Sequence, residues 1–93
     1  MSANPDRKRI KRELRIELSL MSHKGRDGWN GHRNTDYAYT TMPRQQVENL
    51  LIAKGFALHL DNEQQSVWNG PNRVRVAVEP TFTRTKIYVL EHA

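Results

Sequence analysis

The sequence contains no cysteine. This absence excludes a disulfide framework, a zinc site built on thiolates and a catalytic cysteine, and it favours a reducing compartment. Long apolar runs are also missing, since no stretch approaches the roughly 20 apolar residues that a membrane-spanning helix needs. The opening residues, MSANPDRKRIKRE, do not have the apolar core of a signal peptide. We therefore expect a cytoplasmic protein with no membrane partner.

Motifs that carry chemistry are equally scarce. The four histidines form no HExxH pattern, no G-x-S-x-G elbow is present, and no phosphate-binding loop ends in G-K-[ST]. The ten acidic residues are scattered, with no two on one predicted buried element. The sequence therefore predicts no catalytic residue, no metal and no cofactor.

Positive charge is what the sequence does have, and it is concentrated at one end. The 93 residues fit one domain and carry a net charge of +5, to which the first 15 residues contribute six basic and only two acidic side chains. This pattern predicts a flexible basic arm over residues 1–12 that contacts phosphates or acidic proteins; a solvated terminus is the alternative. The candidate arm residues are Arg7, Lys8, Arg9, Lys11 and Arg12.

The first half of the remaining chain contains one predicted strand, one long loop and one helix. Apolar residues alternate over 13–21, ELRIELSLM, which predicts a half-buried strand. Residues 22–36 have the glycine-rich composition of a loop, and YAYTT after them can add an edge strand. Residues 43–54 show a helical stripe that starts near Pro43, with Thr41 as the candidate N-cap. Gly55 ends the helix, and Phe56 can fold back onto Leu51 as in a Schellman motif.

The second half alternates as strands at 56–61, from Ser66, at 73–79 and at 83–90. The apolar residues that these alternations place on one face are Phe56, Leu58, Leu60, Val74, Val76, Val78, Ile87 and Val89. Residues 13–93 are therefore predicted to form one α+β domain. Its sheet is twisted and mostly antiparallel, has about four to five strands, and carries a single helix packed on one face, in the order β–loop–α–β–β–β–β. An exposed last strand could pair across a two-fold axis, which leaves a homodimer open.

The sheet face away from the helix is the first candidate site. Basic side chains on this face can neutralise phosphates, and aromatic rings among them can stack on bases, as in many readers of single-stranded RNA. A polar outer face is also an ordinary requirement of a one-sided sheet. The candidate residues are Trp68, Arg73, Arg75, Arg84, Lys86 and Tyr88.

The loop over residues 22–36 is the second candidate site. Gly25, Gly28 and Gly31 recur at every third position, and such glycines let backbone amides approach phosphates. Trp29 can stack on a base, fill a partner's pocket, or fold back over the sheet edge. The candidate binding residues here are Lys24, Arg26, Trp29 and Arg33.

These features lead to a ranked set of functions. The first is a small non-catalytic module that binds nucleic acid, RNA in preference to DNA, through the arm and the outer sheet face. The alternative is a small regulator or inhibitor that binds an acidic surface of a larger protein or nucleoprotein complex, anchored by Trp29, Trp68 or Ile52. A weaker alternative is a metal-independent ribonuclease that uses the basic outer face with Tyr88 or His92 for proton transfer.

Overall fold

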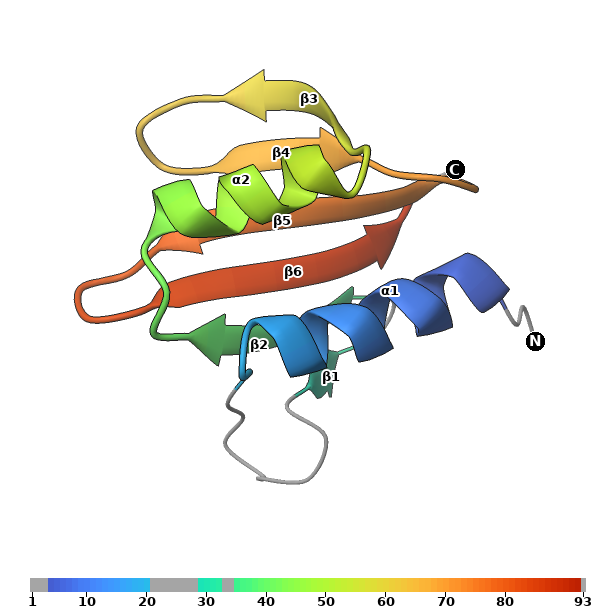
Figure 1. Cartoon of the computed structure of the whole chain (residues 1–93), viewed down its shortest axis with the longest axis horizontal. Helices are drawn as coiled ribbons and strands as arrows, with labels where there is room; N and C mark the ends of the chain where they lie inside the picture. The colour runs from blue at the N-terminus through green and yellow to red at the C-terminus, as the bar shows by residue number, and fades with distance from the viewer. Residues whose placement is uncertain (1–3, 21–28, 33–34, 93) are drawn as a thin grey trace.

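The computed structural model describes residues 4–20, 29–32 and 35–92. Its two helices lie on the same face of one six-stranded antiparallel sheet, whose strand order is β1-β2-β6-β5-β4-β3 (Figure 1). The elements in chain order are α1 (Pro5–Glu17), β1 (Asn30–His32), β2 (Thr35–Thr40), α2 (Arg44–Ala53), β3 (Ala57–Asp61), β4 (Ser66–Asn69), β5 (Val74–Pro80) and β6 (Thr85–Glu91).

The α+β class and the single antiparallel sheet are confirmed, whereas the element count becomes six strands and two helices over the described residues. The predicted strand over residues 13–21 is wrong, because residues 13–17 are the end of α1. Ile10, Leu14 and Leu18 recur every fourth position and are buried, whereas Ile16, which completed the alternation, is 65% exposed.

The predicted flexible arm over residues 1–12 is also corrected, because residues 5–12 belong to α1, which begins at Pro5. The Asn4 side chain accepts hydrogen bonds from the backbone amides of Asp6 and Arg7, and Pro5 occupies the first helical position. Both are standard features of a helix start. The basic residues of 5–12 are therefore held on a helix that packs on the sheet.

The predicted loop over 22–36 is also corrected at its end. Residues 30–32 form β1, and β2 spans Thr35–Thr40, so the first four residues of YAYTT belong to a strand with neighbours on both sides. The last strand, β6, lies between β2 and β5 rather than at an edge. Its backbone is already paired, so the expected route to a homodimer through the last strand is wrong.

The helix predicted over residues 43–54 is confirmed as α2. Gly55 has a φ of 89°, its amide donates to Ile52, and the amide of Phe56 donates to Leu51, which is the expected Schellman arrangement. Pro43, rather than a threonine side chain, occupies the N-cap position.

The core lies between the helices and the inner face of the sheet. The predicted inward residues of the last two strands are buried completely: Val74, Val76, Val78, Ile87 and Val89. On β3 the prediction fails, because Leu58 and Leu60 are 52% and 44% exposed at the edge of the sheet. A register shift between them also places them on opposite faces.

Candidate functional site

The outer face of the sheet, on which neither α1 nor α2 lies, presents three rows of side chains that follow from the strand register. The central row is apolar and aromatic and crosses five strands: Tyr37, Tyr88, Ala77, Val67 and Leu60. One flanking row contains Arg75 beside Leu90, and the other contains Lys86 between Tyr39 and Glu79. An apolar strip with cations on both sides therefore runs across this face.

Lys86 lies at the centre of a tyrosine cluster on β2 and β6. Its ammonium nitrogen is 4.6 Å from the ring centroid of Tyr37, 4.8 Å from that of Tyr88 and 5.8 Å from that of Tyr39. Tyr37 and Tyr39 are also in edge-to-face contact, with ring centroids 6.2 Å apart. A side-chain hydrogen bond with Tyr88 raises the pKa of Lys86, so its positive charge is secure at neutral pH.

A shallow depression of about 350 Å³ adjoins this cluster on the outer face. The small side chain of Ala77 lies between Val67 and Tyr88 in the register, and all three residues line the depression together with Arg75. The Nε of Arg75 donates to the side-chain oxygen of Asn69 at 2.7 Å, which orients the guanidinium. Gln65 and Glu79 also line the depression, so it combines apolar side chains with one fixed cation and one carboxylate.

The structure places the two other predicted cations of this face in turns instead of strands. Arg84 precedes β6, and its guanidinium carbon is 5.9 Å from the ring centroid of Tyr39. It therefore extends the tyrosine cluster toward the β5–β6 turn. Arg73 precedes β5 with a φ of 63° and is exposed, so its predicted position on the sheet face is wrong.

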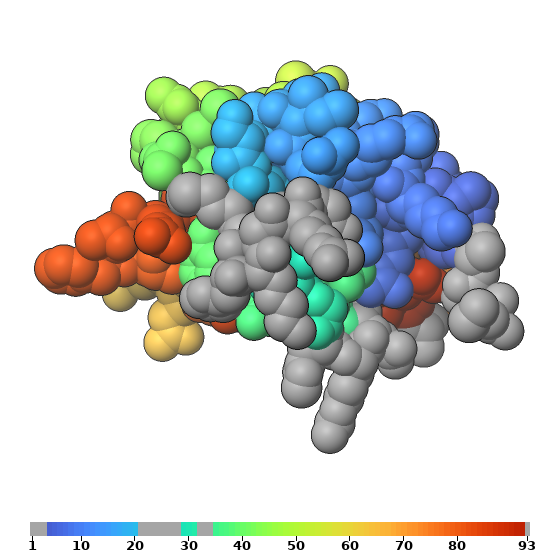
Figure 2. Space-filling model, turned by 90° about the horizontal axis from the view of Figure 1, so that it is seen from below, coloured from blue at the N-terminus to red at the C-terminus, as the bar shows by residue number. Residues whose placement is uncertain are grey.

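Helix α1 carries the second group of cations. Its charges are segregated: acidic side chains face α2, where Lys54 bridges Glu13 and Glu17 at 2.8 and 3.0 Å. The opposite side is a basic stripe at spacings i, i+3, i+4 and i+7, which lines a depression of about 360 Å³ beside Trp29 and consists of Lys8, Lys11, Arg12 and Arg15. Figure 2 shows α1 on the surface of the molecule next to β1.

Some cations of the described chain form ion pairs within the fold, whereas others have no acidic partner in that part of the chain and are available to a ligand. Arg7 and Lys11 both pair with Asp36, at 2.7 and 3.0 Å, and Arg9 pairs with Asp6 and Glu13. Within the described ranges, no acidic partner lies within ion-pair distance of the following cations: Lys8, Arg12, Arg15, Arg73, Arg75, Arg84 and Lys86. Glu79 nevertheless stands opposite Lys86 in the register.

Both tryptophans proposed as ligand contacts are buried. Trp68 is 5% exposed on the inner face, and its Nε1 donates to the Ser66 hydroxyl at 2.9 Å. Trp29 is 9% exposed, and its Nε1 donates to the carbonyl of Lys11 at 3.0 Å. Of the three roles considered for Trp29, the structure therefore agrees with the ring that folds back onto the domain. Trp68 belongs to the core. The predicted contacts Lys24, Arg26 and Arg33 lie outside the described residues.

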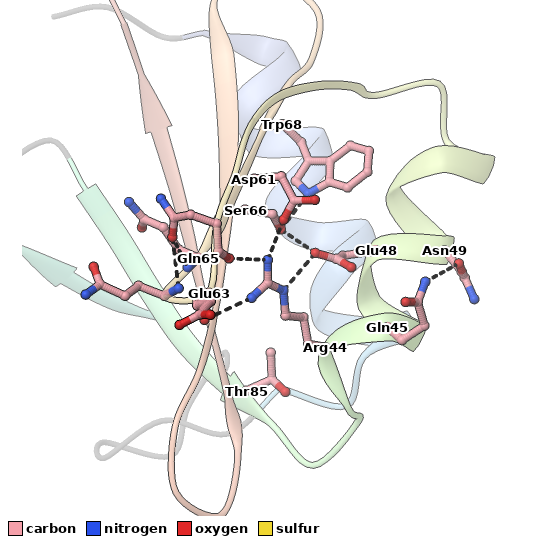
Figure 3. A network of polar contacts seen from close by, with 12 residues as sticks. Arg44, Gln45, Glu48, Asn49, Asp61, Glu63, Gln65, Ser66, Trp68 and Thr85 are labelled. Atoms are coloured by element: carbon pink, nitrogen blue, oxygen red, sulfur yellow. Dashed lines mark hydrogen bonds and ion pairs between the residues drawn. The ribbon is translucent and has the colours of Figure 1, made fainter.

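A separate polar network joins α2 to the β3–β4 hairpin (Figure 3). Ser66 donates to Glu48 at 2.6 Å, and Arg44 donates to Glu48 and to Asp61 at 2.9 and 2.8 Å. Ser66 is fully buried, and its hydroxyl also accepts the hydrogen bond from Trp68. These groups satisfy one another, so the network holds the helix against the sheet.

Among the residues that the structure describes, no three His, Asp or Glu side chains are grouped closely enough to hold a metal ion. No helix of the described chain has the length and apolar character needed to cross a membrane. Comparisons with protein-family models, curated proteins and solved structures gave no match.

Sequence reasoning missed two of the three tyrosines. The signal was available, because Tyr37 and Tyr39 alternate around Ala38 with the period of a strand. Their place beside Lys86 depends on β2 pairing with β6, across nearly fifty residues of sequence.

Proposed function

We propose that this chain is a small non-catalytic module that binds nucleic acid, with RNA preferred over DNA. The observation that carries the proposal is the cluster of Tyr37, Tyr39 and Tyr88 around Lys86 on the uncovered face of the sheet. Aromatic rings on an open sheet offer stacking surfaces to unpaired bases, and adjacent cations attract the phosphates between them.

The charge distribution supports the same conclusion. Most acidic side chains of the described residues are paired with cations that hold the fold together, including Asp36 with Arg7 and Glu48 with Arg44. The remaining cations lie on the outer face, on its adjoining turns and on the basic stripe of α1. An unneutralised charge of this kind supplies the long-range attraction of nucleic-acid binding.

The alternative of a protein regulator has less support, because two of its three expected anchors, Trp29 and Trp68, are buried. Ile52 remains, with 58% of its surface exposed on α2. A hot spot for a protein partner is normally a cluster of large side chains in a well-packed patch. The RNA proposal therefore ranks first.

The test is a fluorescence-anisotropy titration with labelled single-stranded RNA, its DNA counterpart and the matching duplexes, at low and near-physiological salt. We expect single-stranded RNA to bind most tightly. Tyr39→Ala should weaken binding by about tenfold, in the range of one lost stacking contact, and Lys86→Gln should weaken it by removing a cation that attracts phosphate. Ile52→Ala removes an exposed apolar side chain from the opposite face and should bind as the wild type does. No binding to any nucleic acid at low salt would overturn the proposal.

A further inference from the structure

The connection between β5 and β6 holds an aromatic side chain that the tyrosine cluster does not include. Phe82 lies in this turn with its side chain fully exposed, at 102% of the reference area. The turn itself is closed by the amide of Thr81 donating to the carbonyl of Arg84 at 2.8 Å, and by the Thr81 hydroxyl accepting from the amide of Arg84 at 3.1 Å. Phe82 is thus presented to solvent by a well-bonded turn.

Phe82 continues a series of rings and cations along β6. Two residues after it, Arg84 lies over Tyr39, and Tyr39 stands opposite Lys86 in the strand register. Lys86 in turn contacts Tyr88. From the tip of the hairpin inward, aromatic and basic side chains therefore alternate: Phe82, Arg84, Tyr39, Lys86 and Tyr88.

The surroundings of Phe82 leave room for a ligand. The β5–β6 hairpin projects beyond the rest of the molecule (Figures 1 and 2). A depression of about 350 Å³ lies between this turn and the connection from β2 to α2, and its lining includes Met42, Pro43, Phe82 and Arg84. The depression is thus bordered by apolar surface and by a cation without an acidic partner among the described residues.

We infer that Phe82 is a further base-stacking position of the RNA site proposed above, on which this inference rests. A single strand lying on the outer face would place one unpaired base against Tyr88 and Tyr37, one against Tyr39, and one against Phe82. Lys86 and Arg84 lie between these rings, where the connecting phosphates would pass. The ligand is accordingly single-stranded RNA with at least three unpaired bases.

Labelled RNAs of increasing length, from two nucleotides upward, test this inference. We expect Phe82→Ala to weaken binding of an RNA of about ten nucleotides by roughly tenfold, and to have little effect on the shortest RNA that still reaches the tyrosines. Phe82→Trp should bind at least as tightly as the wild type, whereas Phe82→Leu, which keeps apolar bulk without a ring, should bind as weakly as Phe82→Ala. RNA carrying 5-iodouridine at successive positions should cross-link to Phe82 from one end of the strand.

The outcomes separate the inference from the function on which it rests. If the wild type binds RNA and Tyr39→Ala weakens it while Phe82→Ala does not, the stacking role of Phe82 is overturned and the outer-face site remains. If Phe82→Leu binds as the wild type does, apolar bulk at this position is sufficient and the base-stacking role is overturned. If Phe82→Ala changes only self-association in sedimentation, the ring contacts protein instead of a base. If no nucleic acid binds the wild type, the proposed function itself fails.

Discussion

The guanidinium of Arg7 is 2.7 Å from the carboxylate of Asp36, a contact that joins the first turn of α1 to β2. Lys11, one turn further along the helix, reaches the same carboxylate at 3.0 Å. The side chains of Arg7 and Asp36 are 20% and 16% exposed, so water screens their attraction only in part. Asp36 thus holds the N-terminal basic segment on the sheet.

Removing this shared carboxylate should loosen α1. We expect Asp36→Asn to lower the free energy of unfolding by about 1–3 kcal/mol, because it breaks two charge-assisted contacts in a partly buried place. Urea unfolding measures this loss, and hydrogen exchange should show faster exchange in α1 than in β5. Asp61→Asn is the control, since Asp61 pairs with Arg44 but is 59% exposed and should contribute little. Equal stability of wild type and Asp36→Asn would contradict the prediction.

The bridge from Lys54 to α1 predicts a defined dependence on pH. A hydrogen bond from Lys54 holds the pKa of Glu13 below its ordinary value of 4.5. Burial alone would lower the pKa of Lys54, but hydrogen bonds to Glu13 and Glu17 raise it above 10.5. Ionised Glu13 therefore adds to the free energy of unfolding above its ordinary pKa, and this stabilisation is lost as the pH falls through the lowered pKa. Protonated Lys54 adds to the free energy of unfolding below pH 10.5, and this stabilisation is lost as the pH rises through the raised pKa.

Lys54→Met should accordingly lower the free energy of unfolding by about 1 kcal/mol or less at neutral pH, as expected for a partly exposed ion pair. Urea unfolding at a series of pH values should show the difference from the wild type shrinking in acid as Glu13 takes up its proton. A difference that stays constant down to strongly acidic pH would show that Lys54 acts through the packing of its aliphatic stem instead.

Trp68 should be important for stability and unimportant for RNA. Trp68→Phe removes the hydrogen bond to Ser66 and leaves a small cavity, which we expect to lower the free energy of unfolding by about 1–3 kcal/mol. Anisotropy titration of the folded variant should give the wild-type affinity. A loss of RNA affinity in a variant that remains folded would contradict this prediction and indicate that Trp68 contacts the ligand.

The basic stripe of α1 should contribute mainly through phosphates. For single strands, each phosphate neutralised by the protein adds roughly 0.7 to the slope of log affinity against log salt. We therefore expect Arg12→Gln combined with Arg15→Gln to reduce this slope, whereas Tyr39→Ala lowers affinity without changing it. Arg9→Gln removes the same kind of charge from the paired side of α1 and should have a smaller effect. An unchanged slope in the double variant would exclude the stripe from the site.

Gly55 should be difficult to replace because its φ of 89° lies in the left-handed region. A Cβ there meets no atom within 4 Å, so any cost arises from the backbone conformation and not from collision. We expect Gly55→Ala to lower the free energy of unfolding by about 1–2 kcal/mol, and Gly55→Asn by less, because asparagine tolerates this region better. Thermal and urea unfolding would show this order, and equal stability of all three proteins would contradict it.

Local patterns were sufficient to predict α2, its Schellman end and the inward valines of β5, since each depends on residues close in sequence. The same approach misread α1. The alternation of Leu14, Ile16, Leu18 and Leu20 is compatible with a strand. Ile10, Leu14 and Leu18, which are the buried residues, have the four-residue spacing of a helix. Only packing on the sheet distinguished the two, by leaving Ile16 in water.

The basic character of the chain, its lack of cysteine and the alternation of its last two strands are properties of the sequence alone. Which cations remain available was decided by tertiary structure, because Asp36, Asp61 and Glu13 neutralise partners far away in the chain. The tyrosine cluster arose in the same way, when β2 paired with β6 and brought Tyr37 and Tyr39 beside Lys86. Pairing between distant strands and ions depends on three-dimensional proximity, which local sequence patterns do not encode.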